Sequence, residues 1–146
     1  QENERLNVAR SELVKGGIYQ QRSECEAAHD AYCRALEIRE RVLGVAHPDT
    51  ADVYCRLADL YKRNGENLQA EAYYRKAVAA VERAAATDFA KVVLCRCHTR
   101  LARLYTDLCR TAEAQEQIEM GLRLAEYEPG SSETLIKLMS SFSKTD

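Results

Sequence analysis

The sequence has few of the residues that interrupt helices. Its 146 residues include two prolines, six glycines and no tryptophan, whereas alanine, leucine, glutamate, arginine and lysine are abundant. This composition favours α-helix over β-sheet. A chain of this length can bury about 68–70% of its unfolded surface. An all-β fold is therefore disfavoured, and a helical core is expected.

The chain also lacks a charge excess and a long apolar segment. Its 23 acidic and 21 basic residues give a formal net charge of −2, so the overall basic excess of many nucleic-acid-binding proteins is absent. No apolar run reaches the ~20 residues that span a bilayer, and residues 1–10 lack the order of a signal peptide. The sequence predicts a soluble, cytoplasmic protein whose partner is neither a nucleic acid nor a membrane.

Cysteine is the one potentially reactive residue type that is well represented. The six cysteines, all in helix-forming stretches, are Cys25, Cys33, Cys55, Cys95, Cys97 and Cys109. A chain of this size does not need disulfides in order to fold. We therefore expect reduced thiols in an intracellular protein, with three disulfides as the alternative.

The nearest approach to a metal or catalytic motif is Cys95-x-Cys97-His98. Residues two apart on a helix point to nearly opposite sides, so only Cys95 and His98 could share an ion, whereas a structural zinc site needs four ligands. The other histidines, His29 and His47, are not part of a nucleophile–base motif, and no glycine-rich phosphate loop is present. We expect no metal, no cofactor and no enzyme activity.

Three segments of the chain share a pattern of small and aromatic residues. Tyr19, Tyr61 and Tyr105 are separated by 42 and 44 residues, and each is followed at the same spacing by a small, a large and a small residue. After Tyr19 these residues are Ala28, Tyr32 and Ala35; after Tyr61 they are Ala70, Tyr74 and Ala77; and after Tyr105 they are Ala114, Ile118 and Gly121. Small residues let helices approach closely, and large ones fill the gap between them. Each unit is predicted to be a helical hairpin, and the three hairpins are predicted to stack.

The predicted helices are 4–20, 23–43, 48–64, 67–85, 88–108 and 111–126. Ser23-Glu-Cys-Glu26 predicts a capping box, and Asn67 and Thr111 are predicted N-caps. Pro48 fits the first turn of its helix, and Gly65 fits the end of the same helix. A seventh helix over 131–142 is predicted to cover the end of the stack with Leu135, Ile136, Leu138, Met139 and Phe142.

These positions resemble the tetratricopeptide repeat. The second unit has the pattern Tyr54, Leu57, Ala58, Tyr61, Ala70, Tyr74 and Ala77. The first unit departs from it, because Glu12 and Lys15 stand where bulky apolar residues are expected. The long period, with the stretch from Arg34 to Asp49, is similar to the longer repeats of kinesin light chains and nephrocystin-type proteins.

The resemblance implies an all-α superhelix, or solenoid, of three helical hairpins and a C-terminal capping helix. The hairpins are expected at about 4–43, 48–85 and 88–126, and the capping helix at 131–142. Together they would form a single domain over 1–146, which we expect to be a segment of a longer protein.

The resemblance also implies that the first helix of each hairpin lines a concave groove. The positions predicted to face this groove are Arg10, Leu13, Gly17, Gln20, Gln21, Asp52, Cys55, Arg56, Asp59, Lys62, Arg63, Arg96, Thr99, Arg100, Arg103, Thr106 and Asp107. Seven of them are basic and three acidic, a net charge of +4. The predicted partner-binding residues are Arg56, Lys62, Arg63, Arg96, Arg100 and Arg103, because guanidinium groups favour carboxylates. The alternative is a solvated charged face neutralised by Asp59, Glu66 or Glu71.

The predicted function is a non-catalytic protein–protein interaction scaffold that binds an acidic partner segment in the groove. Leu13 and Gly17 replace the Lys and Asn of chaperone-binding repeats, and Cys55-Arg56 and Thr99-Arg100 replace paired asparagines of kinesin light chains. Neither specificity is therefore predicted. The alternatives are a structural module that stacks or self-associates in a cytoskeletal, ciliary or motor-adaptor assembly, and a regulatory domain of a larger enzyme.

Overall fold

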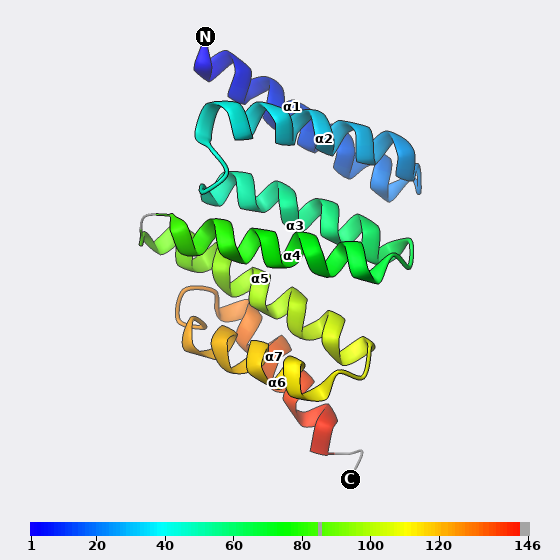
Figure 1. Ribbon diagram of the computed structural model, residues 1–146, viewed down its shortest axis with the longest axis vertical. Helices are drawn as coiled ribbons and strands as arrows, with labels where there is room; N and C mark the ends of the chain where they lie inside the picture. The colour runs from blue at the N-terminus through cyan, green and yellow to red at the C-terminus, as the bar shows by residue number, and fades with distance from the viewer. Residues whose placement is uncertain (85, 144–146) are drawn as a thin grey trace.

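The computed structural model describes residues 1–84 and 86–143, and these contain seven α-helices and no β-strand. The helices are α1 (Glu2–Gln21), α2 (Cys25–Leu43), α3 (Pro48–Arg63), α4 (Asn67–Arg83), α5 (Asp88–Asp107), α6 (Thr111–Arg123) and α7 (Pro129–Ser143). Figure 1 shows them following one another along the long axis of the molecule, with the two termini at opposite ends. The predicted all-α solenoid is confirmed. The helix ends lie within three residues of the predicted ones, except that position 85, the predicted end of α4, is outside the described residues.

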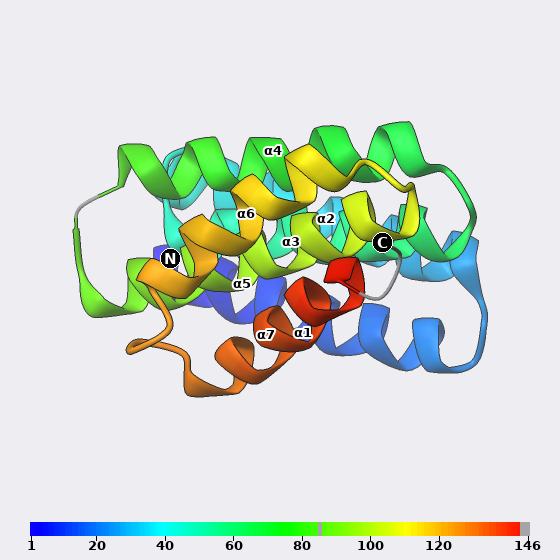
Figure 2. The same ribbon diagram turned by 90° about the horizontal axis from the view of Figure 1, so that it is seen from below.

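The helices form two layers. Figure 2 shows α2, α4 and α6 on one side and α1, α3, α5 and α7 on the other. Three hairpins form by packing of α1 with α2, α3 with α4, and α5 with α6. Contacts of α2 with α3 and of α4 with α5 join the hairpins, and α7 packs against α6. The first helices α3 and α5 also touch directly. Side chains from neighbouring hairpins therefore meet on the surface of the first-helix layer.

Four buried tyrosines, one on each helix from α2 to α5, link that helix to the one before it. Tyr32, Tyr54, Tyr74 and Tyr105 are at most 1% exposed. The Tyr32 hydroxyl donates to Gln20 Oε1 at 2.7 Å, and that of Tyr54 to Glu40 Oε1 at 2.6 Å. The Tyr74 hydroxyl donates to Asp59 Oδ1, and that of Tyr105 to Glu71 Oε1 at 2.9 Å. The predicted packing role of these tyrosines is confirmed, whereas Tyr19 and Tyr61 are only half-buried.

The turn inside each hairpin repeats the same backbone geometry. Ser23, Gly65 and Cys109 have φ values of 62°, 79° and 60°. The residue after each donates its amide to the carbonyl of the repeat tyrosine, Tyr19, Tyr61 or Tyr105, at 2.8 to 2.9 Å. This is the left-handed helix ending that glycine favours, so the prediction for Gly65 is confirmed.

The predicted caps of the second helices are wrong. Helix α2 begins at Cys25 with Glu24 as its N-cap residue, and no side chain caps it. Ser23 has the left-handed conformation that closes α1 and is one residue too early to cap α2. Asn67 and Thr111 are already inside α4 and α6, so they are not N-caps. Backbone bonds to the preceding helix fix these helix starts instead.

Helix α3 starts as predicted, with Pro48 in its first turn. The side chain of His47 caps this helix, because its Nδ1 accepts the Asp49 amide at 3.0 Å. Thr50, which is fully buried, donates to the Gly44 carbonyl at 2.8 Å. The loop between the first two hairpins is therefore held by side-chain hydrogen bonds.

Helix α7 covers the C-terminal end of the third hairpin with part of its predicted surface. Leu135 is fully buried against Ala102 and Ile118, and Leu138 and Phe142 pack beside it. The prediction is wrong for Ile136 and Met139, which are 57% and 41% exposed because they lie on the outer side of the helix. No helix in the described part of the chain is long and apolar enough to cross a membrane.

Candidate peptide-binding pocket

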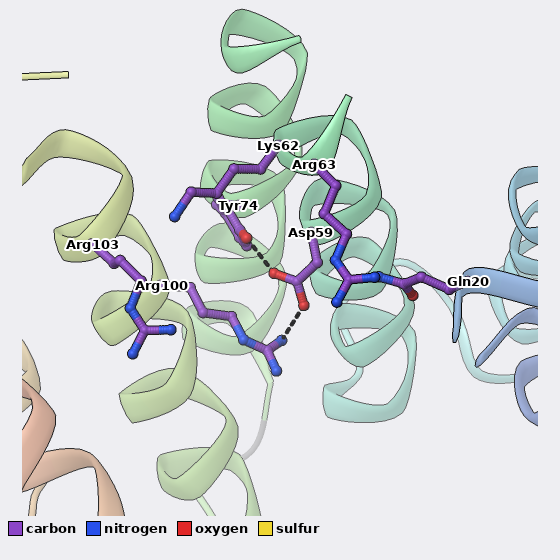
Figure 3. A pocket seen from close by; sticks show the side chains of 7 residues that line it. All are labelled: Gln20, Asp59, Lys62, Arg63, Tyr74, Arg100 and Arg103. Atoms are coloured by element: carbon purple, nitrogen blue, oxygen red, sulfur yellow. Dashed lines mark hydrogen bonds and ion pairs between the residues drawn. The ribbon is translucent and has the colours of Figure 1, made fainter. Parts of the chain in front are cut away.

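A pocket of about 430 Å³ lies between the ends of three first helices. Its lining residues are Gln20 from α1, Asp59, Lys62 and Arg63 from α3, Tyr74 from α4, and Arg100 and Arg103 from α5 (Figure 3). Four of these side chains are basic and one is acidic. The pocket is therefore an electropositive site built by three successive hairpins.

Four of the six predicted partner-binding residues line this pocket, namely Lys62, Arg63, Arg100 and Arg103. The other two do not line it. Arg56 forms an ion pair with Asp52 at 3.1 Å, one turn away on the same helix. Arg96 is paired with Glu128 at 3.0 Å. The structure thus divides the predicted basic residues into a pocket group and two residues outside it.

Carboxylates already neutralise part of the pocket. Arg100 Nη1 lies 3.5 Å from Asp59 Oδ2, and Lys62 Nζ lies 3.0 Å from Asp107 Oδ2. Both pairs join α3 to α5. Among residues 1–84 and 86–143, neither Arg63 nor Arg103 forms an ion pair with a carboxylate, and both side chains are exposed. Arg63 and Arg103 are therefore the pocket cations available to an external anion.

Tyr74 is the pocket residue that the sequence interpretation missed. Its ring was predicted to pack in the core, but its hydroxyl reaches the pocket and donates to Asp59 (Figure 3). Burial and the Asp59 carboxylate raise the pKa of Tyr74 far above its usual value of 10.0, so the hydroxyl keeps its proton. The signal was the choice of tyrosine over phenylalanine, because a buried hydroxyl needs a partner.

Arg100 completes this fixed network. Burial lowers the pKa of its guanidinium, but the Asp59 carboxylate and the neighbouring Cys55, Tyr74 and Cys97 together outweigh that effect, so the pKa lies above its usual value. Asp59 is thus held between Tyr74 and Arg100, one partner from its own hairpin and one from the next. The floor of the pocket is organised before any ligand binds.

Three residues predicted to face the groove are buried instead. Leu13 packs in the core between the first two hairpins. Cys55 lies against Cys97, with the two Sγ atoms 3.1 Å apart. Thr99 donates to the Cys95 carbonyl at 2.8 Å. Leu13 and Cys55 thus face the neighbouring hairpin and Thr99 is bonded to its own helix, so the open surface is narrower than predicted.

In the Cys95-x-Cys97-His98 segment, Cys95 and His98 face α6 of the same hairpin, whereas Cys97 faces the second hairpin. Cys95 Sγ donates to the Gly121 carbonyl at 3.5 Å, and His98 Nδ1 lies 2.7 Å from Gln117 Oε1. Burial lowers the pKa of His98 below its usual 6.5. Within the described residues, no three metal-ligating side chains are arranged to hold an ion.

Comparison with known proteins connects this fold to a repeat family. The sequence model of the tetratricopeptide repeat matches residues 7–83, more than half of the chain. Protein KINESIN LIGHT CHAIN-RELATED 1 of Arabidopsis thaliana is 25% identical over 131 residues, which are 90% of this chain and 21% of that protein. A Clustered mitochondria protein homolog of Aspergillus niger is 29% identical over 90 residues, 62% of this chain and 7% of that protein. The chain therefore spans about a fifth or less of the length of these two relatives.

Two solved structures have a similar fold. BtubC (BKLC) from P. vanneervenii superposes with a TM-score of 0.76 at 23% identity, covering 84% of this chain and 48% of that one. A protein from Podospora anserina, described as a kinesin light chain with nearly identical TPR-like repeats, gives a TM-score of 0.61 at 18% identity. That match covers 94% of this chain and 76% of the other. The predicted resemblance to kinesin-light-chain repeats is confirmed, and the chain belongs to the tetratricopeptide repeat family.

Proposed function

We propose that the protein is a non-catalytic scaffold that binds an acidic segment of a partner protein in the pocket between α1, α3 and α5. Tetratricopeptide repeats generally act as protein-interaction scaffolds, which supports the broader part of this proposal. The observation that supports binding of an acidic segment in this pocket is that Arg63 and Arg103 are not paired with carboxylates in the part of the chain that the structure describes. These two exposed cations line the pocket without a carboxylate partner among the described residues, while Asp59 is occupied by Tyr74 and Arg100.

The proposed mechanism is capture by a preorganised surface. The Tyr74–Asp59–Arg100 network and the Lys62–Asp107 ion pair fix α3 against α5. Little conformational entropy of the receptor is then lost on binding, apart from that of the two free arginine side chains. Each free guanidinium can donate two parallel hydrogen bonds to a carboxylate. Glutamate or aspartate side chains are therefore the preferred contacts of the bound segment.

Fluorescence anisotropy with a labelled glutamate-rich peptide tests this proposal. The double variant R63Q/R103Q should weaken binding by about tenfold or more, because charge-assisted hydrogen bonds contribute about 1.5–3 kcal/mol each. The control R83Q/R123Q removes the same charge from two exposed arginines on α4 and α6, outside the pocket. Equal weakening by the two double variants would show that only net charge matters, and the pocket would be excluded.

A second candidate function is structural, as predicted from the sequence. Exposed apolar side chains lie at both ends of the stack, with Val8, Val14 and Ile18 on α1 and Ile136 and Met139 on α7. These surfaces favour association of repeats end to end. Light scattering over a range of concentrations tests this function, and a strict monomer that captures acidic peptides would exclude it. A cytoplasmic location and a regulatory role in a larger enzyme stay predictions.

A further inference from the structure

Two buried thiols meet where α3 contacts α5. Cys55 is 1% exposed and Cys97 is fully buried. Their Sγ atoms are 3.1 Å apart, although the residues are 42 positions apart in the sequence. This separation exceeds the ~2.05 Å of a disulfide bond by about 1 Å. A disulfide therefore requires the two sulfur atoms to approach by about that distance.

The other cysteines do not share this arrangement. The Cys95 thiol is directed at the Gly121 carbonyl, and Cys33 contacts His29 on its own helix at 3.7 Å. Cys25 donates to Asn64 at 3.3 Å, and Cys109 is exposed in a turn. Within the described residues, the Cys55–Cys97 contact is the one hydrogen bond that joins two thiols.

We propose that Cys55 and Cys97 are a redox modification site, at which a hydroperoxide converts the two thiols into a disulfide that locks the second hairpin to the third. This inference goes beyond the proposed function and does not depend on it. It rests on the distance between the two sulfur atoms, on their burial and on the direct contact of their helices.

The reaction needs no group beyond the peroxide. One thiolate attacks the terminal OH oxygen of the peroxide and the O–O bond breaks. The cysteine becomes a sulfenic acid, and the leaving group is hydroxide or, for an alkyl hydroperoxide, the alkoxide. The second thiol attacks the sulfenic sulfur, the S–S bond forms, and water leaves. In total the two thiols lose two protons and two electrons, and one peroxide is reduced to two molecules of water or, for an alkyl peroxide, to water and an alcohol.

Burial makes this reaction slow but its product durable. Hydrogen bonding to Cys55 and burial raise the pKa of the Cys97 thiol well above its usual value, so little thiolate is present at neutral pH. Oxidation should therefore be faster at pH 8.5 than at pH 7, and it requires a transient opening between α3 and α5. Once formed, the bond is shielded from reductants by the same packing.

The cross-link would act on the pocket. Helix α3 supplies Lys62 and Arg63 to it, and α5 supplies Arg100 and Arg103. A bond between Cys55 and Cys97 joins these helices about one turn from the charged network, four residues before Asp59 on α3 and three residues before Arg100 on α5. It would fix the spacing between α3 and α5, and with it the distance between Arg63 and Arg103, which contact the ligand.

The test is peroxide treatment of the folded chain in a Cys109→Ser background, which removes the exposed thiol. After treatment with hydrogen peroxide, the remaining thiols are alkylated in denaturant and the peptides are mapped by mass spectrometry. The expected result is a peptide pair linked through Cys55 and Cys97, together with a rise in the melting midpoint of about 5–10 °C that a phosphine reductant reverses.

Two further variants make this result specific. C55A should lose the cross-link, whereas C95A, which removes another fully buried thiol of α5, should retain it. If C55A does not fold, as judged by circular dichroism, the reversible midpoint shift of the Cys109→Ser protein still tests the proposal. A cross-link that forms only in denaturant, or none after prolonged peroxide treatment of the folded protein at pH 8.5, would overturn it.

Discussion

Gly16 and Gly17 are adjacent on α1 but differ in what surrounds them. Gly16 occupies the small-residue position that Ala58 and Ala102 fill in the other hairpins. A methyl group at Gly16 would overlap the ring of Tyr32, which is buried and held by its hydrogen bond to Gln20. The neighbouring Gly17 has open space around it. Two adjacent glycines of one helix are therefore under different constraints.

These constraints predict opposite effects of the same substitution. Gly17→Ala should raise the free energy of unfolding by about 0.5–1 kcal/mol, because alanine is the better helix former. Gly16→Ala should lower it by about 1 kcal/mol, because overpacking costs about 1–3 kcal/mol and outweighs the same helix preference. Urea denaturation of both variants measures the difference. Equal shifts would show that the Tyr32 ring does not confine Gly16.

His98 gives the stability of the third hairpin a pH dependence. Its folded-state pKa lies below the usual 6.5 because of burial. As the pH falls below 6.5, the unfolded chain takes up a proton that the folded chain does not, so stability falls with decreasing pH. Between pH 7 and pH 5 the wild type should lose more stability than His98→Gln. Chemical denaturation at both pH values tests this, and parallel losses would contradict it.

At the scale of the element, the hairpin turn is the best-defined unit. Ser23, Gly65 and Cys109 share one left-handed conformation, although only one of them is glycine. A residue with a Cβ atom is strained in this conformation by about 1–2 kcal/mol relative to ordinary helix. The hydrogen bond to the repeat tyrosine carbonyl recurs in all three turns. Backbone geometry, not the side chain, therefore defines the turn.

This geometry predicts the effect of three substitutions. Ser23→Gly and Cys109→Gly should each stabilise the fold by about 0.5–1 kcal/mol, and Gly65→Ala should destabilise it by about 1 kcal/mol. Guanidinium denaturation of the three variants gives these values. If glycine destabilises both turns, the left-handed assignment of Ser23 and Cys109 is wrong.

The elements were largely predictable, whereas the N-caps of the second helices were not. The 42- and 44-residue spacing of the tyrosines placed the six helices of the three hairpins, because hairpin packing repeats with that period. Ser23, Asn67 and Thr111 have the side chains of N-caps, but the turn aligns backbone groups that satisfy the helix ends without them. The preference of Ser, Asn and Thr for N-cap positions was therefore overridden by the backbone geometry of the turn between two packed helices.

At the scale of the whole molecule, the distribution of charge could be predicted only in part. The basic face was visible in the sequence, because first-helix positions follow from the repeat. Asp59 was named as a possible neutralising carboxylate and does pair with Arg100, but which cations remain free was not visible, since the Lys62–Asp107 pair also joins two hairpins. Those pairs depend on how α3 lies against α5. The burial of Leu13 and Cys55 likewise depends on how the neighbouring hairpin packs against them.

The most direct measurement is a binding cycle that combines a change in the peptide with a change in the pocket. The affinity for a glutamate-rich peptide is compared with that for the same peptide carrying glutamine, first with the wild type and then with R63Q/R103Q. If the two free arginines contact the carboxylates, the preference for glutamate should fall by about tenfold or more in the variant. A preference that is absent in the wild type, or unchanged in R63Q/R103Q, would contradict binding of an acidic segment in this pocket.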